Sequence, residues 1–146
     1  YRGFMQTKRL VFRKITQEDY NYLKEIISDY ETMKYYTQPY NDEGVQRWIN
    51  WCLGCYEKRG FGLFAIILKD DNKFIGDCGI TLQNINGKDV FEIGYHINKE
   101  YWNNGYGTEA LFAVIKFLFE ECEAEVISAE FIENNYAFEK SFLKFG

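Results

Sequence analysis

Residues with the chemistry of a catalytic base lie close together in residues 91–98, where polar and apolar positions alternate. In a strand every second side chain shares a face, so Glu92 and His96 lie on one face and flank Gly94. The opposite face carries the apolar residues Phe91, Ile93, Tyr95 and Ile97. A carboxylate or an imidazole can take a proton from an amine, which must be neutral to act as a nucleophile. We therefore predict Glu92 as the preferred general base and His96 as a second candidate.

A glycine-rich loop follows this strand and leads into a predicted helix. Its sequence is Trp102-Asn103-Asn104-Gly105-Tyr106-Gly107-Thr108. The N–H groups of the first turn of a helix have no partner within the helix, and the N-terminus carries a partial positive charge. Gly105 and Gly107 have no side chain to obstruct an approaching anion. The loop therefore predicts a binding site for a phosphate or a pyrophosphate.

Three kinds of glycine loop fit such a site to different degrees. A P-loop is set aside, because no Gly-Lys-Ser/Thr follows the loop. The dinucleotide fingerprint G-x-G-x-x-A is satisfied by residues 105–110, and Glu125 lies near the expected acidic position. That fingerprint belongs to repeated parallel units, however, and here only one such unit is predicted. A loop that caps a helix and binds nothing is the third reading.

The elements that position these residues alternate between hairpins and helices. We expect strand 10–12, helix 18–28 with Thr16 as N-cap, helix 42–59 ended by Gly60, strands 62–69, 74–82 and 90–98, helix 108–121, strand 125–132, and a helix from Asn135. The Asn86-Gly87 pair predicts a tight hairpin. An antiparallel meander followed by one β-loop-α-β unit predicts an α+β fold around a mixed sheet, and not a doubly wound one.

Length and charge restrict the class of protein. The chain has 146 residues, which is the size of one domain; residues 1–4, ahead of Met5, are interpreted as a remnant of cloning. A net charge of −5 argues against a nucleic-acid binder and is compatible with a cationic substrate. No stretch is long and apolar enough for a membrane span or a signal peptide. We expect a cytoplasmic protein that binds neither nucleic acid nor membrane.

Four cysteines, Cys52, Cys55, Cys78 and Cys122, allow two interpretations. The Cys52-x-x-Cys55 pair has the spacing of a redox pair or of half a zinc site, which would require the other two thiols to converge on it. Its place inside a predicted helix favours small buried thiols in a reducing compartment instead. We expect free thiols and no metal.

Residues 91–110 resemble the acyl-CoA loop of the GNAT acetyltransferase superfamily. Within it, Glu-Ile-Gly-Tyr followed by Tyr-Trp-Asn-Asn-Gly-Tyr-Gly-Thr-Glu-Ala is similar to the branch of ribosomal-protein N-terminal acetyltransferases. Residues 8–13 resemble the family's opening strand, Ile75-Gly76 and Gly79-Ile80 its third strand, and Asn135 with residues 144–146 its last conserved helix. The resemblance implies a three-layer fold, with helices on both faces of the sheet and a central strand pair that splays apart at the thioester.

The resemblance also implies acetyl-CoA as the cosubstrate and assigns residues to it. The implied coenzyme A contacts are Tyr95, His96, Ile97, Asn98, Trp102, Asn103, Asn104, Gly105, Tyr106, Gly107, Thr108 and Asn135. Glu92 matches the position of the family's base. The acceptor is expected to enter over residues 29–60, near the aromatic residues Tyr35, Tyr36 and Trp48.

Two features depart from the family pattern. Many members carry a tyrosine in the last helix that protonates the departing thiolate, and some use a serine; the matching positions here are Phe142 and Phe138. Relatives also continue past the glycine that corresponds to Gly146 with further strands. The resemblance therefore implies a single acyltransferase domain in residues 5–146 without those strands, and it identifies no general acid.

These observations together predict an N-acetyltransferase that moves acetyl from acetyl-CoA to a primary amine, either a protein N-terminus or a small molecule. Two other functions remain open. One is a small dinucleotide-binding oxidoreductase that uses the G-x-G-x-x-A loop. The other is a coenzyme A-binding protein without turnover. The sequence leaves the acceptor unidentified and is compatible with a homodimer.

Overall fold

The computed structural model describes residues 5–33, 38–121, 126–133 and 136–144. They form one seven-stranded sheet whose strands stand in chain order. The strands are β1 (Met5–Gln6), β2 (Leu10–Lys14), β3 (Leu63–Leu68), β4 (Phe74–Ile85), β5 (Lys88–Ile97), β6 (Val126–Glu133) and β7 (Tyr136–Lys144). Neighbours pair antiparallel except β5 and β6, which are parallel because a helix carries the chain back between them. The predicted mixed, mostly antiparallel sheet is confirmed.

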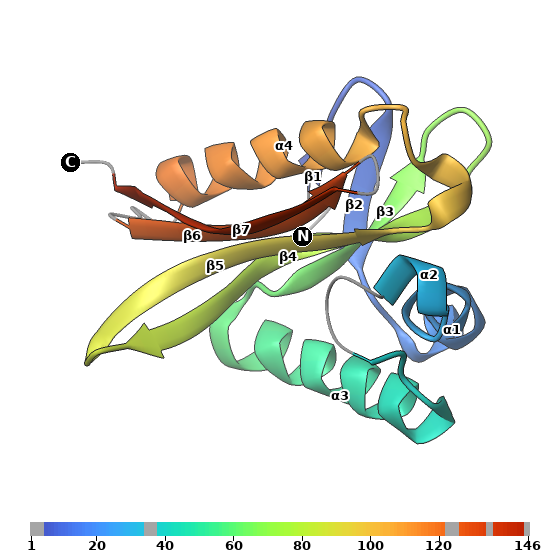
Figure 1. Ribbon diagram of the computed structural model, residues 1–146, viewed down its shortest axis with the longest axis horizontal. Helices are drawn as coiled ribbons and strands as arrows, with labels where there is room; N and C mark the ends of the chain where they lie inside the picture. The colour runs from blue at the N-terminus through green and yellow to red at the C-terminus, as the bar shows by residue number, and fades with distance from the viewer. Residues whose placement is uncertain (1–4, 34–37, 122–125, 134–135, 145–146) are drawn as a thin grey trace.

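Helices cover both faces of this sheet. On one side lie α1 (Tyr20–Ile27), α2 (Tyr30–Met33) and α3 (Asp42–Arg59), and on the other lies α4 (Tyr106–Glu121), as Figure 1 shows. Thr16 caps a 3-10 turn (Gln17–Asp19) ahead of α1, as predicted. Gly60 ends α3 with a φ of 77°, a left-handed conformation that glycine adopts without strain. The three-layer α+β architecture is therefore confirmed, and no helix in the described part of the chain is long and apolar enough to span a membrane.

The β4–β5 hairpin fixes which residues face each other around the predicted bases. Asn86 and Gly87 both have positive φ, 52° and 80°, as a type I′ turn requires. The resulting register places Glu92 opposite Thr81 and His96 opposite Asp77. A slip of one residue would send every side chain of β5 to the other face of the sheet.

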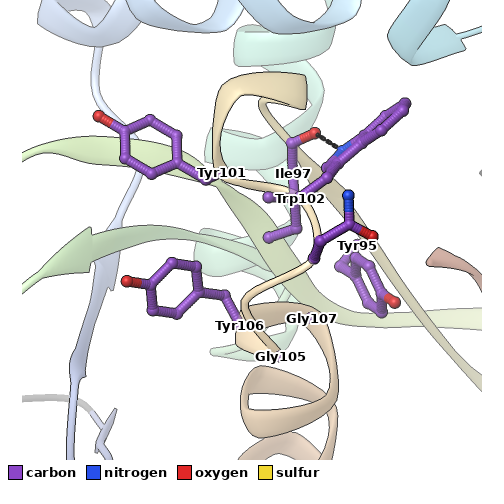
Figure 2. Close-up of a pocket in the computed structure, with 8 residues that line it drawn as sticks. Tyr95, Ile97, Tyr101, Trp102, Gly105, Tyr106 and Gly107 are labelled. Carbon is purple, nitrogen blue, oxygen red and sulfur yellow. Dashed lines mark hydrogen bonds between the residues drawn. The ribbon is translucent and has the colours of Figure 1, made fainter. Parts of the chain in front are cut away.

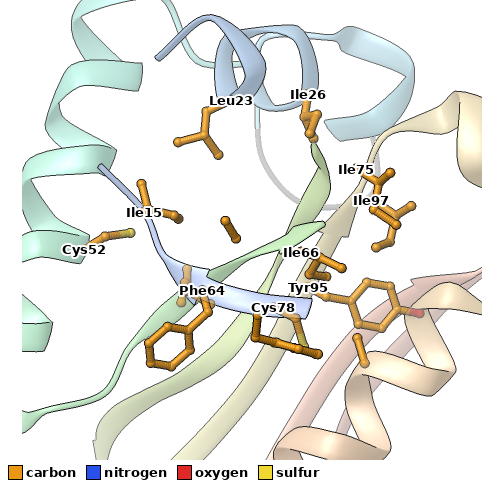
Figure 3. Packing of buried hydrophobic residues seen from close by; sticks show 14 of the residues in the cluster. Ile15, Leu23, Ile26, Cys52, Phe64, Ile66, Ile75, Cys78, Tyr95 and Ile97 are labelled. Carbon is orange, nitrogen blue, oxygen red and sulfur yellow. The ribbon is translucent and has the colours of Figure 1, made fainter. Parts of the chain in front are cut away.

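The core lies on both sides of the central strands. The largest fully buried side chains include Phe12, Phe64, Ile66 and Tyr95, and Figure 3 labels the last three. Burying one such side chain stabilises a fold by about 1.5–3 kcal/mol. Tyr95 packs between β5 and α4, so the strand that carries the predicted bases is held rigidly against the helix that follows the glycine loop.

The segment after β6 differs from the prediction. The sequence and the family resemblance predict a helix from Asn135, whereas residues 136–144 form β7 and pair antiparallel with β6. A connection of two residues suits a hairpin, and aromatic residues favour strands. The predicted helix is therefore wrong, and Phe138 and Phe142, matched to the family's helical proton donors, lie on a strand.

The parallel pair β5–β6 separates towards one end. Pairing joins residues 91–94 of β5 to residues 127–130 of β6. β5 then continues to Ile97, and β6 continues to Glu133 while it stays paired with β7. In the described part of the chain, no pair joins β5 to β6 beyond Gly94. The predicted splayed central pair is thus present, and it opens within the segment that carries His96.

Candidate active site

Hydrogen bonds fasten the glycine loop to the end of β5. The indole Nε1 of Trp102 donates to the backbone carbonyl of Ile97 at 2.7 Å (Figure 2). The side-chain amide of Asn104 donates to the carbonyls of Tyr101 and Trp102, each at 3.0 Å. Trp102 and Asn104, which the resemblance assigns to the cofactor, therefore also close the loop on itself. Such a loop is shaped before any ligand arrives.

The loop ends at the N-terminus of α4, as predicted for an anion site. The carbonyl of Gly105 accepts the N–H of Glu109 at 3.0 Å, so Gly105 caps the helix. α4 begins at Tyr106, two residues before the predicted start at Thr108. Asn103 and Gly105 have φ values of 67° and 77°, and this left-handed geometry turns the chain into the helix. The backbone amides of the first turn thus gather beside the loop.

Gly107 has a different role from the one predicted. The sequence suggests that it leaves room for a phosphate, but a Cβ at Gly107 would lie 2.5 Å from the ring of Tyr95. Gly107 is buried and faces the sheet. Its lack of a side chain lets α4 pack against Tyr95, whereas a Cβ at Gly105 would meet only Arg9, at 3.6 Å. Of the two glycines, only Gly105 has nearly open space beside it.

The space between the loop and β5 is small. A cavity of ≈ 10 Å³, room for about one water molecule, is lined by Tyr95, Ile97, Tyr101, Trp102, Asn103, Gly105, Tyr106 and Gly107. Figure 2 shows these side chains around the start of α4. A phosphate is too large for this cavity. The anion site stays a prediction, and the loop surface that could accept it is the outer one, where Gly105 and Arg9 lie.

Arg9, which the sequence reasoning did not select, lies at that outer surface. Its guanidinium stacks over the ring of Tyr106, with 4.4 Å between the guanidinium carbon and the ring centroid. Its Nε donates to Glu109 at 2.7 Å, and its backbone N–H donates to the same carboxylate at 3.0 Å. The contact spans about a hundred residues of sequence, so no local pattern signals it. Arg9 brings a positive charge to the mouth of the glycine loop.

Glu109 is the residue that holds Arg9 and the β1–β2 turn against α4. Its carboxylate also accepts a hydrogen bond from the hydroxyl of Thr7. Partial burial acts to raise the pKa of Glu109, but the hydrogen bonds from Thr7 and Arg9 outweigh it and lower the pKa below its ordinary value of 4.5. The carboxylate is therefore ionised at neutral pH and is neutralised by Arg9, which reduces its repulsion of an anion at the loop.

The edge of β5 that faces the splay carries backbone groups of Tyr95 and Ile97. The N–H of Asn98 donates to Ile75 of β4 at 2.8 Å, and the N–H of His96 donates to the Asp77 carboxylate at 3.2 Å. Successive residues of a strand point their N–H and C=O groups to opposite edges. The N–H groups of Tyr95 and Ile97 therefore point to the edge that β6 leaves. The resemblance assigns this same stretch to the cofactor arm.

The predicted alternation of β5 is confirmed. Ile93, Tyr95 and Ile97 are buried on the face towards α4, and Glu92 and His96 lie on the other face, where both are partly buried. His96 is in edge contact with Trp48 of α3, with 5.6 Å between ring centroids. The structure thus brings Trp48, predicted to contact the acceptor, next to a predicted base.

Asp77 is the second residue that the sequence reasoning missed. It lies on β4 directly opposite His96, and its Oδ1 is 2.9 Å from His96 Nδ1. The Asp77 side chain is 0% exposed and the His96 side chain 11% exposed. A signal was present in the sequence, because an aspartate inside the otherwise apolar stretch 74–80 requires a partner. The partner could be named only once the hairpin register was known.

Several predicted residues lie outside the described residues. These are Tyr35 and Tyr36, predicted to contact the acceptor, Asn135, assigned to the cofactor, and Cys122. Cys52, Cys55 and Cys78 are free and buried, and Cys52 and Cys55 lie within α3 as predicted. Burial raises the pKa of the Cys52 and Cys78 thiols well above the ordinary value, so both are inert as nucleophiles at neutral pH.

Comparison with known proteins relates this geometry to one family. The family model for the acetyltransferase (GNAT) domain matches residues 9–146. The YkkB protein of Bacillus subtilis is 33% identical over 98 residues, which is 66% of this chain and 56% of YkkB. The uncharacterized N-acetyltransferase YnaD of the same organism is 31% identical over 124 residues, 84% of this chain and 69% of YnaD. The chain therefore spans little more than half the length of YkkB.

Solved structures share the fold. A GNAT-family acetyltransferase from Bacillus anthracis has a TM-score of 0.70 at 29% identity, and the match covers 86% of this chain and 72% of that one. RimL, a ribosomal α-N-protein acetyltransferase in complex with coenzyme A, has a TM-score of 0.63 at 12% identity, with 85% of this chain and 71% of RimL covered. At 12% identity the likeness to RimL concerns the fold alone.

Proposed function

This chain belongs to the GNAT acetyltransferase family, and from that premise we propose that it transfers an acetyl group from acetyl-CoA to a primary amine. One observation carries the proposal: the loop that opens α4 lies beside the edge of β5 that β6 leaves beyond Gly94. An anion site next to an open strand edge suits a ligand with a pyrophosphate followed by an arm of amides, because the amides can pair with the strand. Coenzyme A has this composition.

The residues present fit such a ligand. The amides of Tyr106, Gly107 and Thr108 at the start of α4 would hold phosphate oxygens, and the guanidinium of Arg9 would add a charge-assisted contact. Gly105 leaves the approach open. Along the edge of β5, the carbonyl of Tyr95 and the N–H of Ile97 would pair with the amide-bearing arm. RimL, crystallised with coenzyme A, has the same fold.

The reaction requires the chain to supply few groups. Acetyl-CoA supplies a thioester carbonyl. The backbone N–H of Tyr95, which points into the splay, would donate to that carbonyl oxygen as negative charge develops on it. Glu92 and His96 stand on the face towards α3, where either would take the proton of the attacking amine. A thiol is acidic enough to leave as thiolate, so the absence of an assigned general acid does not prevent turnover.

The acceptor is proposed to approach from the side of α3. Trp48 lies there beside His96 and packs against Tyr40 and Trp51, with 5.6 and 5.4 Å between ring centroids. An aromatic wall next to partly buried acidic groups suits an alkylammonium ion. The net charge of −5 would attract a cation over longer range. Both a protein N-terminus and a small polyamine satisfy this chemistry.

Ligand-induced stabilisation tests the cofactor. Coenzyme A or acetyl-CoA at about 100 times its Kd is expected to stabilise the protein by roughly 2.7 kcal/mol, seen as a rise in Tm, and NAD(H) is expected to give none. Acetyl transfer is then measured as thiol release with spermidine, kanamycin and peptides that begin with serine or alanine. A Tm rise with NAD but not with coenzyme A contradicts the proposal, as does failure of every amine to release thiol.

A further inference from the structure

We infer that Asp77 positions the imidazole of His96 so that its Nε2 takes the proton of the acceptor amine. This inference rests on the proposed acetyl transfer and names the proton acceptor for it. Asp77 acts as a positioning residue, buried behind His96, and the two side chains come from neighbouring strands at the point where the sheet opens. The preferred base predicted from sequence, Glu92, is then not the group that accepts the proton.

The contact fixes both the ring and its tautomer. Asp77 Oδ1 accepts the backbone N–H of His96 at 3.2 Å and lies 2.9 Å from Nδ1 of the same residue. A carboxylate accepts hydrogen bonds, so the proton of a neutral imidazole resides on Nδ1. Nε2 then carries the lone pair. The edge contact with Trp48 restrains the ring from the α3 side, at 5.6 Å between centroids.

His96 is the cation-forming side chain that can balance Asp77. Within the described residues, no lysine or arginine lies within salt-bridge distance of this carboxylate. A buried carboxylate without a partner is costly, so the contact with Nδ1 of His96 supplies the partner that Asp77 requires. The surroundings reflect the same negative charge. Burial, and after it the charge of Asp77, raises the pKa of Tyr40, Cys52 and Cys78.

The groups that face the pair leave few competitors for the proton. Tyr40, and Cys52 and Tyr56 of α3, all stay protonated at neutral pH, because burial raises their pKa values. Glu92 is the other ionisable group on the same face of β5. It stands opposite Ser128 in the closed part of the β5–β6 pair, whereas His96 lies beyond Gly94, where the strands separate. A thioester that enters through the splay meets His96 first.

The step balances without any further reactant. The amine lone pair forms the C–N bond to the acetyl carbonyl carbon, the C–S bond breaks, and its electron pair leaves with sulfur as a thiolate. Before the attack, Nε2 of His96 takes the extra proton of the acceptor ammonium, and after it the proton that the new amide nitrogen sheds goes to water. An imidazolium is a stronger acid than a thiol, so the same proton can pass on to the thiolate. One residue would then act as base and acid in turn, which suits a chain that has phenylalanine at both family positions for the acid.

Imidazole NMR tests the positioning directly, because His96 is the only histidine of the chain. In ¹⁵N-labelled protein without a histidine tag, the neutral ring is expected to be the Nδ1–H tautomer. The substitution Asp77→Asn is expected to shift it towards Nε2–H, since a side-chain amide can donate to Nδ1. A wild-type ring in the Nε2–H form, or a tautomer unchanged by Asp77→Asn, overturns the inference without reference to activity.

Kinetics with the best amine test the role in transfer. We expect His96→Gln to lower kcat about 10²–10⁴-fold and Asp77→Asn about 10–100-fold, with the Kd for coenzyme A unchanged within about twofold. The loss in Asp77→Asn should shrink as pH rises, because more of the amine is already neutral. Asp77→Glu, which keeps a carboxylate, should recover part of the rate.

Two further variants separate the competing explanations. Asp19→Asn removes a similarly buried carboxylate that lies away from this site and is paired with Arg13 at 2.8 Å. This control should lower stability without altering the pH profile of kcat. Glu92→Gln tests the competing base and is expected to lower kcat less than His96→Gln does. If Glu92→Gln loses the rate and Asp77→Asn does not, Glu92 is the base and only this inference fails. If none of the amines tested makes the wild type release thiol, the proposed function itself fails.

Discussion

Arg9 shows how much of a site can depend on a residue that local sequence gives no reason to select. It lies directly before β2, yet its side chain reaches the glycine loop. The Glu109 carboxylate accepts hydrogen bonds from the backbone N–H and the Nε of Arg9, and the guanidinium stacks on the ring of Tyr106. The side chain is 40% exposed, so the outer nitrogens remain accessible from solvent. That combination of a fixed orientation and an accessible charge is what a phosphate requires.

Replacing Arg9 by alanine is expected to weaken coenzyme A binding by about 10–100-fold, the equivalent of one charge-assisted hydrogen bond of ~1.5–3 kcal/mol. Removal also leaves the Glu109 carboxylate without its counter-charge beside the phosphates. Calorimetric titration with coenzyme A measures the effect. Lys8→Ala is the matched control, since Lys8 is a neighbouring exposed cation. An equal loss in both variants would mean that only overall charge matters.

Among the elements, α4 packs on β5 at Gly107, where there is no room for a side chain. The ring of Tyr95 occupies the space that a Cβ at Gly107 would need, at 2.5 Å. The neighbouring Gly105 is required for a different reason, its φ of 77°. Two glycines that look alike in sequence therefore serve packing in one case and chain direction in the other.

The two glycines should separate in experiment. Gly107→Val is expected to destabilise the protein by about 1–3 kcal/mol through overpacking against Tyr95, visible as a lower urea midpoint. Gly105→Ala should lower the free energy of unfolding by about 1–2 kcal/mol through backbone strain. It should lower the free energy of coenzyme A binding by more than that. Denaturation and titration are measured on both variants. A folded Gly107→Val of unchanged stability would disprove the packing role.

At the scale of the whole molecule, the Thr7–Arg9–Glu109 contact joins the first strands to the helix on the far side of the sheet. Because the pKa of Glu109 is lowered in the folded protein, its contribution to stability is fully present above the ordinary value of 4.5. This contribution is lost as the pH falls through the lowered pKa that Glu109 has in the folded protein. Acid should therefore weaken the contact between the first strands and α4.

Glu109→Gln tests this linkage. The variant is expected to lose roughly 2–8 °C in Tm near pH 7, from ~1–2 kcal/mol of charge-assisted hydrogen bonding, and to differ less from wild type below about pH 4. Thermal unfolding between pH 3 and 7 measures both. Glu120→Gln, an exposed carboxylate on the same helix, serves as control. A Tm difference that stays constant across this range would show that Glu109 acts by packing alone.

Local patterns in the sequence determined most of the fold and the outline of the site. The alternation of β5, the Asn86-Gly87 turn, the limits of α3 and the glycine loop ahead of α4 all follow from periodicity and from short-range turn and cap chemistry, which depend on residues close in the chain. Those same rules placed Glu92 and His96 on one face. Local preference was not sufficient for residues 136–144, where a two-residue connection and pairing with β6 gave a strand in place of the expected helix.

Only the tertiary structure decided which distant residues complete the site. Asp77 meets His96 because the hairpin register sets them opposite each other, and Trp48 reaches the same imidazole because α3 packs on that face. Arg9 arrives at the loop through a carboxylate a hundred positions away. The splay after Gly94 likewise depends on where β6 turns to β7 and away from β5. Such contacts arise from the packing of separate elements, and no periodicity within one element encodes them.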